Sequence, residues 1–250
     1  MIEWAIVIVG AIHCGVFLNL IYRFSLLPSP IQSKNGLTFS IIIPVRNEVN
    51  NLSRLLESIH QQDYPGEKFE IIVVDDSSED GTLEQVKSES HSGLKFLSLS
   101  GGKKGKKAAI ELGVANATKE IILTTDGDCR VPQTWLSSFN QAFDERTKMV
   151  VGPVKMTYSN FLGALQSFDF SILIGYAASL VGMGIPSMSN GANLAYRREV
   201  FGEVGGYSGN DQIPSGDDEF LLLKVVKKHP SGIRFLKDSG AVVSTEPKPG

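Results

Sequence analysis

Short apolar runs alternate along the chain with segments whose apolar residues recur at helical spacing. Apolar runs of strand length occupy residues 39–44, 69–74, 94–99 and 120–125. Between the first two runs, Leu52, Leu55, Leu56 and Ile59 recur every three or four positions, which predicts a helix. A second helix is predicted across residues 107–117. Because strand, helix and strand follow one another in this order, the pattern predicts parallel units of a doubly wound α/β fold.

The N-terminal segment differs, because residues 4–21 are nearly all apolar and are interrupted mainly by His13 and Asn19. As a helix these residues would span roughly 27 Å, close to the hydrocarbon thickness of a bilayer. Glu3 stands where a signal peptide carries positive charge, and no cleavage pattern follows. Arg23 and Lys34 come after the apolar segment, which places the rest of the chain in the cytoplasm. Residues 1–24 are therefore predicted to be a transmembrane anchor, with a buried core helix as the alternative.

The rest of the chain divides into a linker and one folded domain. Residues 25–37, rich in Pro, Ser, Asn and Gly, are predicted to be the linker, and residues 38–250 the domain. A further apolar stretch at residues 161–185 is interrupted by Gln166 and Asp169. This interruption favours a core helix or a membrane-surface helix over a second membrane span.

Composition narrows the function classes. With 250 residues, of which 42% are hydrophobic and 20% charged, the chain can bury a substantial core. The net charge of −3 and the pI of about 5.8 argue against a nucleic-acid partner. Cys14 and Cys129 are the only cysteines, so neither a disulfide framework nor a structural zinc site is expected, and a reducing compartment is favoured.

Polar residues follow several of the predicted strands, at the edge where such sheets bind ligands. They are Arg46, Asn47 and Glu48 after the first strand, Asp75 and Asp76 after the second, and Asp126 and Asp128 after the last. Asp126 and Asp128 lie two residues apart, so they can converge at the strand end, where a hard cation such as Mg²⁺ or Mn²⁺ would relieve their repulsion. The alternative is that these carboxylates serve as structural turns and helix caps.

A lysine-rich loop at residues 101–107 precedes the second predicted helix. Its three glycines and four lysines are typical of a loop that binds phosphate at a helix N-terminus, although a solvated charge run is the alternative. No Walker sequence is present, and residues 44–47 replace the glycine-rich turn of a dinucleotide-binding fold. A nicotinamide cofactor is therefore not favoured.

Five motifs in order resemble glycosyltransferase family 2 over residues 38–246. They are Ile-Pro-Val-Arg-Asn-Glu (43–48), Val-Val-Asp-Asp-Ser-Ser-Glu-Asp-Gly-Thr (73–82), Gly-Lys-Lys-Ala-Ala (105–109), Thr-Asp-Gly-Asp (125–128) and Gly-Asp-Asp-Glu-Phe-Leu (216–221). The resemblance implies a GT-A fold with a mixed, mostly parallel sheet flanked by helices. It also implies inverting transfer of a sugar from a nucleoside-diphosphate sugar, with UDP favoured, to a glycan or lipid-linked acceptor at a bacterial-type plasma membrane.

The same resemblance assigns roles to individual residues. Pro44, Glu48 and Asp76 would shape the nucleoside pocket, Arg46 would also bind the nucleotide-sugar, and Lys106 would lie near the base or the diphosphate. Asp126 and Asp128 match the Asp-x-Asp motif, with Asp128 as the principal ligand of Mg²⁺ or Mn²⁺. Asp218 would be the catalytic base. Its neighbours Asp217 and Glu219 also suit the first turn of a helix, so the motif order rather than acidity selects it.

The segment at residues 189–198 resembles a family stretch that borders the donor sugar and the acceptor. Gly191 would permit close approach of the backbone there, and the alternative is a loop that enters a strand, with Arg197 and Arg198 solvated.

One departure from the family concerns the C-terminal side of the domain. Many membrane-bound members carry a Gln-x-x-Arg-Trp motif after the base, whereas tryptophan occurs in this chain only at positions 4 and 135. The chain ends shortly after a strand-like segment at residues 241–245, which suggests truncation. Two other functions therefore stay open: a membrane-tethered module that binds a nucleotide-sugar without turnover, and a metal-dependent nucleotidyltransferase. The second typically begins with a glycine-rich basic loop, which the residues after the first strand do not resemble.

Overall fold

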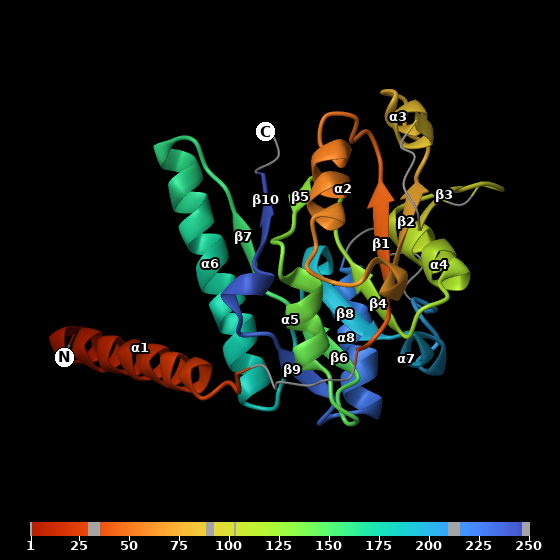
Figure 1. Cartoon of the computed structure of the whole chain (residues 1–250). Coiled ribbons are helices and arrows are strands. Elements are labelled where there is room, and N and C mark those ends of the chain that lie inside the picture. Colours follow the sequence, from red (N-terminus) through yellow and green to blue (C-terminus); the bar gives the residue numbers. More distant parts are fainter. Residues whose placement is uncertain (1, 30–35, 89–92, 103, 210–215, 247–250) are drawn as a thin grey trace.

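The protein contains a seven-stranded sheet and a three-stranded sheet with helices packed around them (Figure 1). The computed structural model describes residues 2–29, 36–88, 93–102, 104–209 and 216–246. In spatial order the large sheet contains β3 (Leu94–Ser98), β2 (Phe69–Asp75), β1 (Phe39–Val45), β4 (Ile121–Thr124), β8 (Leu194–Arg197), β6 (Met149–Val151) and β9 (Ile233–Phe235). The predicted strands are therefore present, with ends shifted by a residue or two.

Strand β1 lies at the centre of the parallel half of this sheet. It pairs in parallel with β2 and β4, and β2 pairs in parallel with β3. Because Val45 is level with Asp75, and Ile42 is level with Thr124, the loops that follow these three strands leave the sheet at the same edge. Strand β8 runs antiparallel to both β4 and β6, so the sheet is mixed but mostly parallel, as the resemblance implied.

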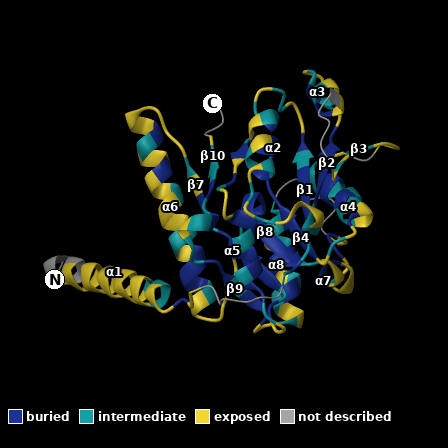
Figure 2. Cartoon of the chain, viewed as in Figure 1, coloured by how far each residue is buried: buried dark blue, intermediate teal, exposed yellow. Residues whose placement is uncertain are grey.

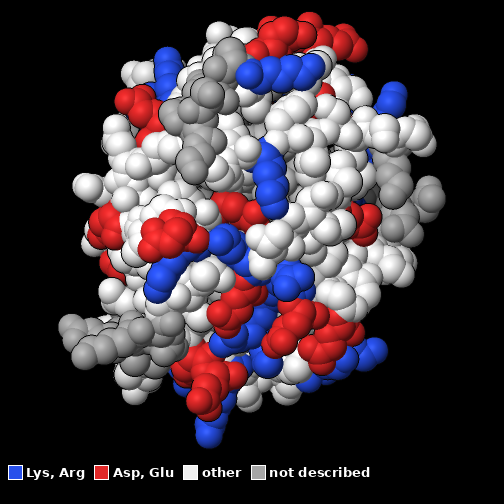
Figure 3. All heavy atoms as spheres, turned by 45° about the vertical axis from the view of Figure 1, so that its right-hand side comes forward, with Lys and Arg blue, Asp and Glu red and all other residues white. Residues whose placement is uncertain are grey.

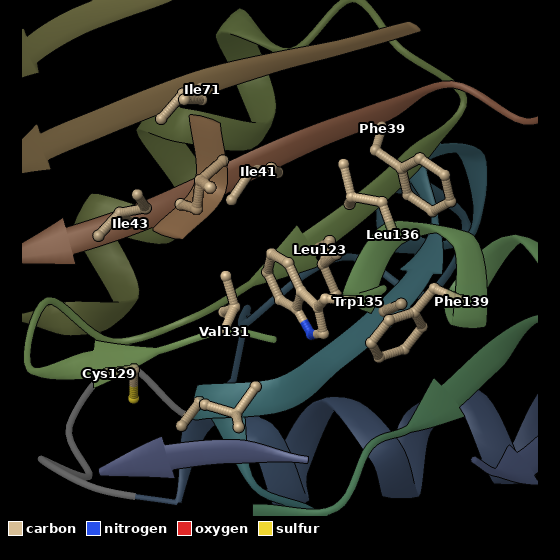
Figure 4. Packing of buried hydrophobic residues seen from close by; sticks show 14 of the residues in the cluster. Phe39, Ile41, Ile43, Ile71, Leu123, Cys129, Val131, Trp135, Leu136 and Phe139 are labelled. Carbon is tan, nitrogen blue, oxygen red and sulfur yellow. The ribbon is translucent and has the colours of Figure 1, made fainter. Parts of the chain in front are cut away.

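Helices cover both faces of the large sheet. Helices α2 (Leu52–His60) and α5 (Trp135–Ala142) supply one hydrophobic cluster, and α4 (Lys106–Asn116), α7 (Arg198–Glu203) and α8 (Asp217–Lys228) supply the other. A short helix, α3 (Thr82–Ser88), follows β2. Side chains along β1 point alternately to the two faces of the sheet, so Ile41 and Ile43 belong to the first cluster and Ile42 to the second. Figure 4 shows part of the first cluster, which includes Leu123, Trp135 and Phe139.

The smaller sheet joins the end of the domain to the middle of the chain. Its strands are β5 (Cys129–Arg130), β10 (Val243–Thr245) and β7 (Val154–Met156). Strand β10 pairs antiparallel with β5 and parallel with β7. Because β5 begins directly after Asp128, this sheet fixes the position of the backbone next to Asp128, which is one of the two residues predicted to bind metal.

Two long apolar helices lie on one side of the domain. Helix α1 (Ile2–Ser25) projects from the body, whereas α6 (Phe161–Gly182) runs along it beside the small sheet (Figure 1). Most of α1 is exposed (Figure 2), which fits a membrane anchor better than a buried core helix. By length and composition alone, both residues 7–25 and α6 could cross a membrane. The anchor therefore stays a prediction, and residues 30–35 of the predicted linker lie outside the described residues.

Candidate functional site

A cavity of about 260 Å³ opens at the edge where β1, β2 and β4 end. Its lining residues are Pro44, Val45, Arg46, Glu48, Asp76, Lys106, Asp126, Gly127 and Asp128. Seven of the nine residues predicted from the sequence are among them. The other two, Gly191 and Asp218, adjoin the cavity through Lys106, as described below. The tertiary structure thus gathers the predicted residues at one edge of the sheet. Acidic and basic side chains are interspersed on the face of the molecule that Figure 3 shows.

The loops after β1 and β2 are fastened to each other. Ser78 Oγ accepts a hydrogen bond from Asn47 N at 3.0 Å, and Asn47 Oδ1 accepts one from Glu79 N at 2.8 Å. Glu48 N donates to Thr82 Oγ1 at 2.9 Å. Asn47 has φ of 58°, a left-handed conformation that asparagine tolerates better than most residues. Asn47 therefore connects the two loops without lining the cavity, a structural role that its place in the strand-end motif did not reveal.

The two adjacent carboxylates after β2 have different roles. Asp75 accepts a hydrogen bond from Ser78 N at 3.2 Å and so closes the turn, in agreement with the structural alternative. The buried Asp76 accepts from Gly105 N at 3.0 Å through Oδ2, which also lies 3.9 Å from the Arg46 guanidinium. Its other oxygen, Oδ1, is buried without a hydrogen-bond partner among the described residues. Asp76 therefore has an acceptor oxygen available to a ligand.

Asp126 and Asp128 are brought together by a turn rather than by alternation along a strand. Strand β4 ends at Thr124, and Cys129 N then donates to Asp126 O at 3.1 Å. A side chain on Gly127 would place its Cβ 3.0 Å from Glu48 Cγ, so the turn needs its glycine to approach the neighbouring loop. Asp126, Gly127 and Asp128 therefore form a turn and also line the cavity. Gly127 is a cavity residue that the sequence did not identify.

The donor atoms at this turn suit a hard divalent cation. Among the described residues, no group of three or more His, Cys, Asp or Glu side chains is placed to hold a metal. Burial, followed by the charges of Asp126 and Asp128, raises the pKa of Cys129 to about 12, which keeps the sulfur a neutral thiol. The two carboxylates fit Mg²⁺ or Mn²⁺, because proteins bind such ions through one or two carboxylates and let substrate phosphates complete the shell.

Lys106 is the cation that lies next to the carboxylate turn, whereas Arg46 lies beside Asp76. Lys106 is the first residue of α4, and its Nζ lies 2.5 Å from Asp126 Oδ1. Burial lowers the pKa of Lys106, but the negative charges of Asp126, Asp217 and Asp218 outweigh that effect and raise it, so the ammonium stays charged.

The other lysines of the glycine-rich loop lie elsewhere or are not described. Lys107 Nζ lies over the Phe220 ring, 5.3 Å from its centroid, and Lys104 is exposed. Lys103 lies outside the described residues. Of the described residues in the predicted phosphate-binding loop, Lys106 is therefore the one that lines the cavity.

Asp218 lies in the first turn of α8 and is held by the turn that begins at Gly191. Gly191 N donates to Asp218 Oδ2 at 2.9 Å, and Thr124 Oγ1 donates to Gly191 O at 2.7 Å. A Cβ built on Gly191 would lie 3.3 Å from Lys106 Nζ, so this glycine separates the lysine from the carboxylate. Burial and then the Asp217 charge raise the pKa of Asp218 to about 6, and the Lys106 charge opposes them.

The segment at residues 189–198 adjoins the site and also enters a strand, but the alternative was wrong about Arg197, whose side chain is only 15% exposed and therefore not solvated. Its first part, around Gly191, adjoins the site, and its second part enters β8 at Leu194. Arg197 lies at the far end of that strand, where it forms an ion pair with Glu120 at 2.7 Å. The arginines of this segment therefore do not reach the cavity.

Sequence comparisons place the chain near known transferases. The family model described as glycosyl transferase family 2 matches residues 40–205. The chain is 31% identical over 181 residues to glycosyltransferase AglE of Haloferax volcanii, an alignment that covers 71% of this chain and 58% of AglE. It is 32% identical over 130 residues to the poly(ribitol-phosphate) β-N-acetylglucosaminyltransferase TarS of Staphylococcus aureus, covering 52% of this chain and 22% of TarS. The chain thus spans less than two thirds of these relatives.

Structural comparisons confirm the GT-A fold. The mannosyltransferase PcManGT from Pyrobaculum calidifontis, solved in complex with GDP-Man and Mn²⁺, superimposes with a TM-score of 0.73 at 22% identity. That match covers 100% of this chain and 70% of PcManGT. S. aureus TarS in complex with UDP-GlcNAc superimposes with a TM-score of 0.63 at 21% identity, over 86% of this chain and 60% of the TarS chain.

Proposed function

The chain belongs to glycosyltransferase family 2, and on that premise we propose that it moves a sugar from a nucleoside-diphosphate sugar to an acceptor hydroxyl with inversion at the anomeric carbon. The observation that carries this proposal is the gathering of Asp76, Lys106 and the Asp126–Asp128 turn around one cavity, with Asp218 beside it. These groups are the ones that such a transfer needs: acceptors for a nucleoside, positive charge for a diphosphate, and a base.

The nucleoside would occupy the end of the cavity formed by the loops after β1 and β2. Asp76 Oδ1 is an acceptor without a protein partner among the described residues, so a donor group of the base or ribose would satisfy it. Pro44, Arg46 and Glu48 form the adjoining wall. We favour a UDP-sugar because TarS structures hold UDP and UDP-GlcNAc, although PcManGT holds GDP-Man.

The diphosphate would lie toward Lys106 and the carboxylate turn. Asp128 and Asp126 would hold Mg²⁺ or Mn²⁺, and that ion would neutralise charge on the departing nucleoside diphosphate. The Mn²⁺ in the PcManGT complex supports this assignment. Lys106 supplies a second positive charge next to Asp126, so the leaving group would meet positive charge from both the ion and the protein.

Asp218 would take the proton from the acceptor hydroxyl as its oxygen attacks the anomeric carbon from the face opposite the diphosphate. A pKa of about 6 leaves this carboxylate mostly ionised at neutral pH while making it a better base than a solvated aspartate. The hydrogen bond from Gly191 N fixes its orientation. Asp218 lies beyond the residues that the family model matches, so its assignment rests on the motif order and on this geometry.

The acceptor and the location belong to the same proposal. We propose a glycan or lipid-linked acceptor of cell-envelope type, reached by a cytoplasmic domain that α1 anchors to the membrane. Arg23, in the last turn of α1, agrees with a cytoplasmic C-terminal side for that helix.

A product assay on the full chain tests the reaction class. Purified protein in detergent is given a panel of nucleotide-sugars with Mg²⁺ or Mn²⁺, with and without membrane-extract acceptors, and free nucleoside diphosphate is measured. We expect acceptor-dependent release of the diphosphate that EDTA abolishes. Pyrophosphate release from a nucleoside triphosphate and a sugar 1-phosphate would instead indicate a nucleotidyltransferase. Donor-induced thermal stabilisation without any turnover would indicate a binding module.

A further inference from the structure

The outer face of α6 presents a row of apolar side chains to the surroundings. Phe161, Leu162 and Phe168 are 76%, 70% and 63% exposed, and Leu165 and Ile172 continue the same row at helical spacing. The opposite side of the helix packs on the domain through Gly163, Ser167, Phe170, Ile174 and Ala178, which recur at helical spacing. Soluble proteins seldom expose an apolar area of this extent unless something covers it.

From Ile172 onward this face continues into the C-terminal end of α1 through mainly apolar side chains. The two helices touch, because Ser179 Oγ donates to Leu20 O at 3.0 Å and a Cβ on Gly182 would lie 3.1 Å from Arg23 O. Between them lies an apolar cavity of about 420 Å³, lined mainly by Phe17, Leu20 and Phe24 of α1 and by Ile172, Leu173 and Tyr176 of α6. Whatever medium surrounds this end of α1 therefore also contacts α6.

We propose that the outer face of α6 is embedded in the interface of the same membrane leaflet that holds the C-terminal end of α1. In Figure 1, α1 runs across the direction of α6. When α1 spans the bilayer along its normal, α6 therefore lies along the membrane surface instead of forming a second span. The lipid surface would fill the cavity between the helices with acyl chains.

The polar groups on and near α6 set its depth. Asp169 is exposed within the apolar row, and burying its charge in hydrocarbon would be costly, so the helix lies at the level of the headgroups. Tyr158 and Tyr176 are exposed aromatic residues of the kind found at that level. Lys237 Nζ donates to the carbonyls of Phe24 and Ser25, both at 3.2 Å, which places a cation at the cytoplasmic end of α1.

The second contact with the membrane would orient the catalytic cavity. Helix α6 follows β7, and Ser167 Oγ donates to Met156 O at 2.8 Å, so the helix is fixed to the small sheet. That sheet reaches Asp128 through β10 and β5. Attachment through both α1 and α6 would therefore hold the cavity at one inclination to the membrane.

Spin-label accessibility in the full chain tests this proposal without measuring turnover. Leu162→Cys, Leu165→Cys and Phe168→Cys are each made in a Cys14→Ser background and labelled with a nitroxide in phosphatidylcholine vesicles. Cys129 is buried and stays unlabelled. The native chain labelled at Cys14 reports on α1, and Glu57→Cys on the exposed side of α2 is the control in water. All three α6 positions are exposed, so labelling leaves the core intact, which thermal unfolding checks.

We expect the three α6 labels to collide with lipid-soluble oxygen several-fold more, relative to a water-soluble nickel chelate, than the label at Glu57. Preferential collision with the nickel chelate would show that α6 faces water and would overturn the proposal. Low accessibility to both agents would show that protein covers the helix, whether a partner or a second copy, and would also overturn it. Preferential collision of the nickel chelate with the label at Cys14 would show that α1 is not in the membrane, and the proposal, which depends on that anchor, would then be wrong. None of these outcomes depends on whether sugar transfer occurs.

Discussion

The carboxylates of the site have different surroundings, and these differences suit them to different roles. Asp76 keeps one oxygen without a partner in the described part of the chain, Asp126 is neutralised by Lys106, and Asp218 has a raised pKa. When neighbouring carboxylates have such different surroundings, one can bind a ligand while another acts as a base at the same site. Asp75, next to Asp76, shows the opposite case, because its oxygen closes a turn.

Replacement of the proposed base gives the sharpest test at the residue scale. We expect Asp218→Asn to lower kcat by about 10²–10⁴-fold, because the amide cannot take the acceptor proton. The donor Kd should change little, since the amide oxygen can still accept from Gly191 N. In the native enzyme, kcat/KM should fall as the pH drops through about 6, where Asp218 becomes protonated. Initial rates and donor titration measure both effects, and near-normal transfer by the variant would refute the assignment.

Lys106→Met provides the companion test of the pH argument. The Lys106 charge lowers the pKa of Asp218, so its removal should move the acidic limb of the kcat/KM profile to higher pH. Donor affinity should also weaken, because the charge beside the diphosphate is lost. If the acidic limb stays in place or moves to lower pH, the inferred effect of the Lys106 charge on the pKa of Asp218 would be wrong.

At the scale of elements, Asn193 joins parts of the fold that are distant in sequence. It is fully buried at the start of β8, and its Oδ1 accepts from Trp135 Nε1 of α5 at 2.9 Å. Its Nδ2 donates to Pro153 O at 2.7 Å and to Ala241 O at 2.9 Å. A side chain on Gly152 would overlap this amide, so close packing of the backbone preserves the arrangement. Asn193 thereby couples the large sheet, α5 and the approach to the small sheet.

Truncation of this side chain should be costly. We expect Asn193→Ala to lower the free energy of unfolding by on the order of 3 kcal/mol, because it leaves the buried Trp135 indole N–H and the buried Ala241 carbonyl without this partner and leaves Pro153 O with only the hydrogen bond from Val243 N. Urea unfolding in detergent measures the change. Asn116→Ala is the matched control, since that amide donates to Leu112 O from an exposed position on α4 and should cost less than about 0.5 kcal/mol. Equal losses in the two variants would contradict the coupling role of Asn193.

At the scale of the whole molecule, the two long apolar helices lie apart from the edge of the sheet that holds the cavity. Helix α1 leaves the body, and α6 lines the same side (Figure 2). The carboxyl ends of β1, β2 and β4 form a separate edge that holds the cavity. In the proposed function, attachment and catalysis would therefore use different parts of the fold, so a loss of one can be distinguished from a loss of the other by experiment.

Membrane retention is the corresponding prediction. The full chain should stay with membranes through an alkaline carbonate wash and be released by detergent, because α1 is long enough and apolar enough to span. A double variant, Ile12→Glu with Val16→Glu, should become extractable by carbonate, since each charge at mid-helix costs about 3 kcal/mol on insertion. Native protein that carbonate releases would show that α1 does not span the bilayer.

Several elements and the chemistry of the site were readable from the sequence. The spacing of Leu52, Leu55, Leu56 and Ile59 predicted α2, and the apolar runs predicted the parallel strands, because periodicity reports the local geometry of a helix or strand. The strand-end rule then brought the polar residues after β1, β2 and β4 to one edge, and the motif order identified the family. These conclusions need only short-range patterns and a known topology.

Other features were decided by contacts between distant parts of the chain. Nothing near Asp218 in the sequence indicates that its carboxylate meets Gly191 N beside Lys106, and nothing local distinguishes Asp75 from Asp76. The carboxylates of the Asp-Gly-Asp motif converge through a turn, where alternation along a strand had been expected. Local spacing determines which element forms and which faces it has. Only the packing of those faces determines which side chains meet, which charges shift a pKa, and which apolar surface stays uncovered.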